Sequence, residues 1–275
     1  MAKVRSSAAA PVGVISKVLR VLEAIQSAPA GLGLKGISDL TGIHKSTAHR
    51  FLKHLERENY LISTEDGAYL LGPRFWQMTT HVNHRATLQA VARPILWELW
   101  RSTQETVNLA LFDQGTVLYA DVIESPHEFR LASRVGTRRP LHATALGKAL
   151  AAFLPDAQKK NIFSTITFQA STPKTIMNLV QFRQELEKVA RQGYAVDDEE
   201  AVAGARCVSA PVLDARGEAV AAVSVSGPTT RISLHQIPVL AEAVTTAAKA
   251  ISAGIGFAEP RAKRIRTQKT GLARQ

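Results

Sequence analysis

Hydrogen-bond donors gather on one side of a short segment near the N-terminus. Residues 42–57 have the apolar spacing of an amphipathic helix that begins near Lys45. The side opposite the apolar residues presents ammonium, hydroxyl, imidazole and guanidinium groups and no carboxylate. Such groups bind phosphate oxygens and the edges of bases, so the segment is a candidate DNA-contacting helix. Taken without its flanks, the same pattern also fits a helix face that only meets solvent.

The expected DNA contacts fall into two chemical sets. The candidate residues are Lys45, Ser46, Thr47, His49, Arg50 and Lys53. We expect the serine, the histidine and the arginine to contact base edges. The two lysines and the threonine are better suited to phosphate contacts, which fix position without reading sequence.

Another group of residues could in principle perform catalysis. Cys207, His142 and Asp197 are a conceivable thiol nucleophile, base and orienting acid. Their spacing along the chain neither supports nor excludes this, because such groups meet in space. No known nucleophile motif surrounds Cys207, and the interior of a strand is a poor place for a thiolate. We expect no catalytic residue, and a Cys-dependent enzyme is the alternative function.

Metal binding has weak support in the sequence. The eight histidines are scattered, and His81 with His84 lack any partnering cysteine or metalloprotease context. We therefore expect no metal and no cofactor.

The residues around the candidate helix predict the motif that positions it. Gly42 fits a short turn between two helices, and Asp66-Gly67 is a strong tight-turn pair between two short strands. The expected elements are helices over 14–28, 35–41 and 45–57 and strands over 60–62 and 69–71. This order predicts a winged helix-turn-helix, in which the second helix of the pair enters the major groove of DNA.

Composition and charge agree with two domains, one of them basic. The 275 residues have a net charge of +11 and a single cysteine, which excludes an intramolecular disulfide. Residues 1–85 hold 11 Lys and Arg against 6 Asp and Glu, residues 86–258 hold 17 against 16, and residues 259–275 hold 6 against 1. The excess at both ends favours a polyanionic partner. With no apolar run of ~18 residues and no signal-peptide pattern, we expect a cytoplasmic protein without a membrane partner.

The second half of the chain predicts an antiparallel sheet with helices on one or both faces. Two hairpins are expected, each around a glycine-containing turn, and a further strand over residues 129–133. The remaining expected elements are strands 107–112, 117–123, 207–213 and 219–225 and helices 88–101, 145–154, 177–192 and 237–251. The overall fold class is therefore α+β.

Several stretches together resemble the IclR family of bacterial transcriptional regulators. Residues 16–25 and 31–61, with the run KSTAHR, and residues 67–74 are similar to its winged-helix domain. RRPLHATALGKALAAFL at 138–154, GYAVDDEEAVAGARCVSAPVLD at 193–214 and AAVSVSGPTTRI at 221–232 resemble its second domain. The resemblance covers nearly everything except the two ends.

The resemblance implies a ligand-responsive DNA-binding regulator. It implies a winged helix joined by a linker helix to a GAF-like α/β effector-binding domain, in a dimer or dimer of dimers on a pseudo-palindromic operator. We expect a flexible N-terminus (1–12), the winged helix (13–74), a linker (75–87), the effector-binding domain (88–257) and a basic disordered tail (258–275).

The same resemblance places a small organic or aromatic acid in the second domain. Carried over, its contacts are Ala145, Leu146, Gly147, Asp197, Glu200 and Cys207. A helix beginning at Ala145 would offer unpaired N–H groups to a carboxylate, and Phe129 and Leu131 could form an apolar wall. The structural alternatives remain open: a core cysteine, a solvated acidic run over 197–200, and a His142 that bonds only a backbone carbonyl.

Overall fold

The computed structural model describes residues 13–79 and 84–256 and divides the chain into two compact units, 1–83 and 84–275. The ends expected to be flexible, residues 1–12 and 258–275, lie outside the described residues. The segment expected to be a linker, 75–87, contains most of one helix and the start of the next. No helix within 13–79 or 84–256 has the length and hydropathy to cross a bilayer.

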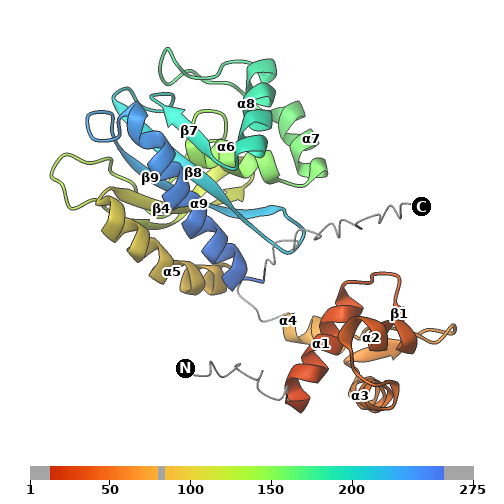
Figure 1. Cartoon of the computed structure of the whole chain (residues 1–275). Helices are drawn as coiled ribbons and strands as arrows, with labels where there is room; N and C mark the ends of the chain where they lie inside the picture. The colour runs from red at the N-terminus through yellow and green to blue at the C-terminus, as the bar shows by residue number, and fades with distance from the viewer. Residues whose placement is uncertain (1–12, 80–83, 257–275) are drawn as a thin grey trace, which may run out of the picture. The chain divides into compact units, whose positions relative to one another are not determined.

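The N-terminal unit is a three-helix core with a small antiparallel sheet (Figure 1). Its elements are α1 (Val14–Gln26), β1 (Leu32–Gly33), α2 (Leu34–Thr41), α3 (Lys45–Arg57), β2 (Leu61–Ser63), β3 (Ala68–Leu71) and α4 (Arg74–Thr79). The strand order is β1-β3-β2, so β1 adds an edge that the sequence pattern did not predict. Val21, Ile37 and Leu52, one from each of α1, α2 and α3, are completely buried in the core.

Gly42 sets the angle between α2 and α3. Its φ of 66° lies in the left-handed region, where a residue with a Cβ is strained, and its N–H closes α2 on Ser38 O. The helix-turn-helix expected over residues 35–57 is thus present, with α3 beginning at Lys45 as predicted.

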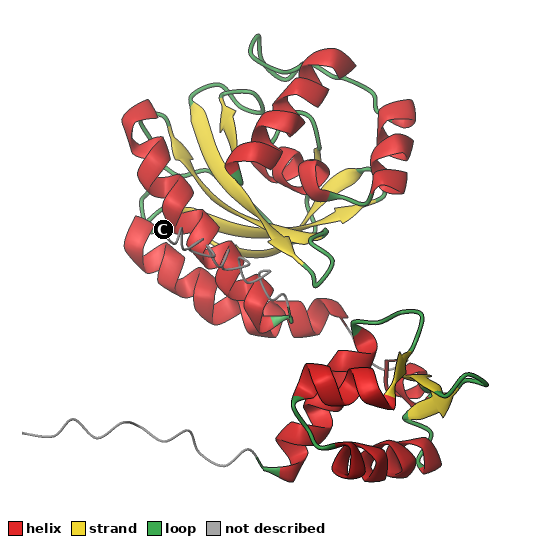
Figure 2. Cartoon of the chain, turned by 45° about the vertical axis from the view of Figure 1, so that its right-hand side comes forward, coloured by secondary structure: helices red, strands yellow, loops and turns green. Residues whose placement is uncertain are grey.

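The C-terminal unit is a six-stranded sheet with helices on both faces (Figures 1 and 2). Its elements are α5 (His84–Thr103), β4 (Thr106–Asp113), β5 (Thr116–Ile123), β6 (Arg138–Pro140), α6 (Ala145–Phe153), α7 (Asp156–Thr165), α8 (Leu179–Gln192), β7 (Ala195–Asp198), β8 (Ala205–Leu213), β9 (Ala219–Pro228), the 3-10 turn η1 (Leu234–Gln236) and α9 (Ile237–Gly254). The strand order is β6-β5-β4-β9-β8-β7, and every pair is antiparallel.

Alternation along the strands divides the interior into two cores. On β4, Val107 and Leu109 pack with α5 and α9, whereas Ala110 packs with α6 and α8 on the other face. Asn108 precedes Ala110 by two residues and therefore lies on the α6 face, although it is polar and fully buried. The mostly antiparallel sheet and the α+β class are confirmed.

Three local expectations differ from the structure. The strand predicted over residues 129–133 is wrong: this segment is an irregular connection, and the strand that pairs with β5 on the side away from β4 is β6, from Arg138. α7 and β7 were not predicted, because α7 has no clear apolar stripe and β7 is only four residues long. α5 also begins earlier than the helix expected from Leu88.

Candidate functional site

The start of α3 presents its polar side chains to solvent. His44 caps the helix: its Nδ1 accepts the N–H of Ser46 at 3.4 Å and lies 2.8 Å from the Ser46 hydroxyl oxygen. The exposed candidates are Lys45, Ser46, His49, Arg50 and Lys53, and Thr47 is half-buried. Ala48, Phe51 and Leu52 face the core, so the two sides of the helix are divided as the apolar spacing predicted.

A carboxylate shares this exposed side, contrary to the prediction that the polar face carries none. Glu56 lies seven residues after His49, and its carboxylate accepts from Lys53 Nζ at 2.8 Å and from the Ser63 hydroxyl at 2.5 Å. These hydrogen bonds lower the pKa of Glu56 and raise the pKa of Lys53. Lys53 is therefore partly neutralised, whereas Lys45 and Arg50 form no ion pair with any described residue.

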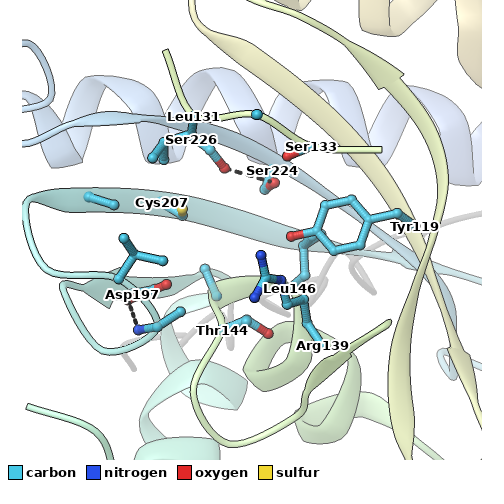
Figure 3. A pocket seen from close by; sticks show the side chains of 15 residues that line it. Tyr119, Leu131, Ser133, Arg139, Thr144, Leu146, Asp197, Cys207, Ser224 and Ser226 are labelled. Atoms are coloured by element: carbon cyan, nitrogen blue, oxygen red, sulfur yellow. Dashed lines mark hydrogen bonds between the residues drawn. The ribbon is translucent and has the colours of Figure 1, made fainter. Parts of the chain in front are cut away.

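The C-terminal unit contains a pocket at the start of α6 (Figure 3). The predicted effector contacts that line it are Leu131, Ala145, Leu146, Asp197 and Cys207. The lining also includes polar residues that the sequence did not single out: Tyr119, Ser133, Arg139, Thr144, Ser224 and Ser226. They come from five separate segments, so only the sheet order brings them together.

Strand register aligns one wall of the pocket. Asp197 on β7 lies opposite Cys207 on β8, and Cys207 lies opposite Ser226 on β9. Burial, followed by the nearby Asp197 carboxylate, raises the pKa of the Cys207 thiol, which therefore stays protonated at neutral pH. Burial raises the pKa of Asp197 to about 7, although its Oδ1 accepts the N–H groups of Glu200 and Ala201 at 2.7 and 3.2 Å.

Arg139 supplies a positive charge to the pocket. β6 pairs with β5 through Val117 and Arg139, and the Arg139 guanidinium extends towards Leu146 and the Tyr119 hydroxyl (Figure 3). Arg139 has no ion pair with a described residue, whereas the neighbouring Arg138 pairs with Asp113. Burial raises the pKa of Tyr119, so its phenol remains a hydrogen-bond donor. Sequence reasoning missed Arg139, although it directly precedes the family-like PLHATA run.

The beginning of α6 adds backbone donors to the pocket. Thr144 caps the helix by accepting the Gly147 N–H at 3.0 Å. Ala145 and Leu146 are the first two helical residues, and a helix provides no acceptor for the N–H groups of its first turn. Both residues line the pocket, so the positive end of the helix and Arg139 favour an anionic ligand there.

Three predicted effector residues do not line the pocket. The Phe129 side chain is 74% exposed. A Cβ on Gly147 would lie 2.3 Å from Leu141 O, so this glycine permits close backbone packing beneath the pocket. Glu200 turns towards the buried Lys148, with 2.5 Å between carboxylate oxygen and ammonium nitrogen. The contribution of Glu200 to the pocket is its backbone N–H, which donates a hydrogen bond to the pocket residue Asp197.

The catalytic arrangement considered for Cys207 is not assembled. His142 lies outside the pocket lining, and its Nε2 is 3.2 Å from Gln169 O, which agrees with the structural alternative. Burial lowers the pKa of His142 and raises that of Cys207, opposite to what a thiolate–imidazolium pair requires. Across residues 13–79 and 84–256 no cluster of three metal-ligating side chains occurs. His81 is outside the described part of the chain.

The pocket is small in this structure. Its cavity volume is about 70 Å³, whereas pockets for drug-sized ligands have ~300–1,000 Å³. A drug-sized ligand therefore requires the pocket to widen.

Known proteins match the chain over both units. The family model described as the IclR helix-turn-helix domain matches residues 14–63, and the model described as the bacterial transcriptional regulator IclR C-terminal matches residues 80–253. The HTH-type transcriptional regulator KdgR of Escherichia coli is 32% identical over 246 residues, which are 88% of this chain and 94% of that protein.

Solved structures agree with this match. The crystal structure of the Thermotoga maritima IclR has a TM-score of 0.61 and 29% identity, covering 88% of this chain and 98% of that one. An IclR homologue of Microbacterium hydrocarbonoxydans complexed with 4-hydroxybenzoate has a TM-score of 0.57 over 88% of this chain and 99% of that one. At 23% identity, the second likeness shows the fold alone.

Proposed function

Because the chain belongs to the IclR family of bacterial transcriptional regulators, we propose that α3 binds a promoter operator and that a small acid in the pocket beside α6 controls this binding. As a member of that family the protein is a DNA-binding transcriptional regulator with an effector-binding domain, and it is not an enzyme.

At the DNA, Ser46, His49 and Arg50 contact base edges and Lys45 and Thr47 contact phosphates. Their exposure at the start of α3 supports this assignment, because the N-terminal residues of a recognition helix approach the bases. Lys53 contributes less than its charge suggests, since Glu56 already pairs with it. Two or more subunits place two copies of α3 on a pseudo-palindromic operator, and the site of action is the cytoplasm, where the chromosome is.

The observation that most supports an acidic effector is the Arg139 guanidinium, which has no ion-pair partner among the described residues. It lines the pocket together with the first turn of α6 and the protonated Tyr119 phenol, all of them donors to an anion. Leu131 and Leu146 provide apolar surface beside them. The structural relative that binds 4-hydroxybenzoate holds a ligand of this chemical class, an aromatic carboxylate.

Control of DNA binding requires the acid to distinguish two arrangements of the protein. The acid changes operator affinity only to the extent that it binds the DNA-competent and DNA-incompetent arrangements unequally. In this proposal residues 13–74 bind DNA and residues 88–257 bind the effector, so the two ligands bind to different units of the chain.

A thermal-shift experiment on the full chain tests the effector proposal. The probes are pyruvate, L-lactate, benzoate and 4-hydroxybenzoate, with benzamide as the neutral analogue of benzoate. A ligand at 100 times its Kd adds ~2.7 kcal/mol to the free energy of unfolding. At least one acid should raise the melting temperature of the wild type and of Arg138→Gln, and should have a much smaller effect on Arg139→Gln. Equal shifts in both variants, or an equal shift with benzamide, would contradict the proposal.

A further inference from the structure

Ser224 and Ser226, which line the pocket, differ from the other buried serines in the hydrogen-bond acceptors available to their hydroxyl protons. In the described part of the chain the remaining buried serines each donate to a backbone carbonyl oxygen, at 2.7–2.8 Å: Ser125, Ser209 and Ser252. Ser224 and Ser226 are 0% and 5% exposed and have no such bond among the described contacts. Their hydroxyl oxygens instead accept from the side-chain amide of Asn108, at 3.1 and 3.3 Å.

Asn108 reaches both serines because of strand register. It lies on β4 directly opposite Ser224 of β9, and Ser226 follows two residues later on the same face. The Asn108 side chain is completely buried, and its Oδ1 has no hydrogen-bond partner among the described residues. A buried carbonyl oxygen without a donor is unfavourable, so its retention needs a reason.

The amide has only one favourable orientation at this position. Its nitrogen carries two protons, and each serine accepts one of them. Rotating the amide by half a turn would exchange its nitrogen and oxygen. The two amide protons would then lie where Oδ1 now lies, a position with no hydrogen-bond partner among the described residues. The observed orientation pairs both amide protons, and it makes both hydroxyl oxygens acceptors from Asn108.

The hydroxyl protons must then point elsewhere. The two hydroxyl oxygens lie 3.5 Å apart, so at most one proton can be shared between them, and only weakly. Ser226 also lies beside the Cys207 thiol, which is a weak acceptor. Both of these acceptors are weak, and both serines line the pocket, so an oxygen of a ligand there is the stronger acceptor for their protons (Figure 3).

We propose that Asn108 is a positioning residue that turns the hydroxyl protons of Ser224 and Ser226 into the pocket and thereby selects a ligand with an oxygen acceptor, a carboxylate or carbonyl oxygen, at that wall. The inference rests on the proposed effector role of the pocket and deepens it. The ligand meets cationic and backbone donors at Arg139 and the start of α6, and hydroxyl donors on β9. Asn108 itself does not line the pocket and acts only through the serines.

Neutron diffraction from crystals of the perdeuterated full chain, grown without any carboxylate, tests the orientation directly. The expected result is two deuterons on Asn108 Nδ2, each facing one serine oxygen, with hydroxyl deuterons directed into the pocket. Hydroxyl deuterons directed at Asn108 Oδ1 would overturn the proposal. This measurement uses the wild type and does not depend on which effector binds.

Isothermal titration with benzoate and benzylamine tests the consequence for specificity. In Asn108→Asp the new carboxylate accepts both hydroxyl protons, so the serines present lone pairs to the pocket. The ratio of benzoate affinity to benzylamine affinity should fall by about 10–100-fold, the effect of one hydrogen bond to a charged group. Ser209→Ala removes a buried hydroxyl on the neighbouring strand and should leave the ratio unchanged.

The outcomes separate the two proposals. An unchanged ratio in Asn108→Asp, or an equal weakening of both probes, would give Asn108 a purely structural role. If benzoate fails to bind the wild type, that result counts against the acidic effector, and the neutron structure still decides the role of Asn108.

Discussion

The ammonium nitrogen of Lys148 lies 2.5 Å from a carboxylate oxygen of Glu200, and the two side chains are only 1% and 12% exposed. The same ammonium donates to Val196 O and lies 3.3 Å from a carboxylate oxygen of Glu185. One buried cation therefore joins α6, α8 and the turn after β7. Because α6 begins at the pocket and Asp197 lies on β7, this cation fixes two walls of the pocket relative to each other.

Replacing Lys148 by Met should strongly destabilise the C-terminal unit. The change leaves the Glu200 carboxylate buried without its partner, and breaking a buried ion pair from one side costs ~3–5 kcal/mol. Urea denaturation of the full chain measures the loss. Lys188→Met is the matched control, because Lys188 is 57% exposed and only 3.8 Å from Glu185, and such surface pairs contribute ~0–1 kcal/mol. Similar losses in the two variants would show that Lys148 is not a structural centre.

Binding of an acid should weaken as the pH rises from 6 to 8. Burial raises the pKa of Asp197 to about 7, so this carboxyl is mostly neutral at pH 6 and mostly ionised at pH 8. Its negative charge then repels an acidic ligand. Asp197→Asn remains neutral and keeps an oxygen for the N–H groups of Glu200 and Ala201. Titration calorimetry with benzoate should show a pH-dependent Kd in the wild type and a flat one in the variant. A pH-independent wild type would contradict the raised pKa.

The same carboxyl should make the fold less stable as the pH rises. Burial raises the pKa of Asp197 from 3.8 to about 7. Between pH 3.8 and about pH 7 the Asp197 carboxyl is therefore ionised in the unfolded chain and still protonated in the folded chain. The contribution of Asp197 to stability is therefore full below pH 3.8 and is lost as the pH rises through 7. Thermal melting across this range should show a decline in the wild type that is smaller in Asp197→Asn. Equal declines would assign the pH dependence to other groups.

Local pattern predicted the elements well and the pocket only in part. The helix face from Lys45 to Lys53 follows from apolar spacing alone, and that expectation agrees with the burial of Ala48, Phe51 and Leu52. Arg139, Tyr119, Ser224 and Ser226 could not be assigned, because strand order and register bring them together from segments far apart in sequence.

Two other residues, Phe129 and Glu56, show that the spacing of apolar residues does not predict where an individual side chain lies. Apolarity suggested Phe129 for the pocket wall, but residues 124–137 form no strand that could turn its side chain inward. Glu56 joined the α3 surface because a long side chain reaches beyond its own helical position to Lys53 and Ser63.

Gly147→Ala should destabilise the C-terminal unit. The added Cβ would meet the Leu141 carbonyl oxygen at 2.3 Å, and backbone cannot move aside as a flexible side chain can. Overpacking of this kind costs ~1–3 kcal/mol. Gly33→Ala is the control, since its Cβ would meet nothing within 4 Å. Thermal melting followed by circular dichroism compares them, and an unaltered melting curve for Gly147→Ala would mean that α6 shifts freely at this point.

Glu56→Gln should strengthen binding to DNA. The change removes a negative charge beside the recognition helix and releases Lys53 from its ion pair. One further phosphate contact increases the slope of log K against log salt concentration by ~0.9. Fluorescence anisotropy with a labelled promoter duplex at several salt concentrations measures both effects. Glu23→Gln on the exposed side of α1 makes the same charge change away from α3 and should alter the slope less. An identical gain in both variants would reflect net charge alone.

The most direct measurement compares the full chain on a duplex from its own upstream region with a scrambled duplex of the same length and composition. Anisotropy titrations should show ~10³-fold or greater preference for the promoter duplex. Arg50→Ala should lose ~1–3 kcal/mol of that discrimination if the arginine contacts a base. Equal affinity for both duplexes at every salt concentration, with or without each of the four acids, would contradict a promoter-binding regulator that reads DNA through α3.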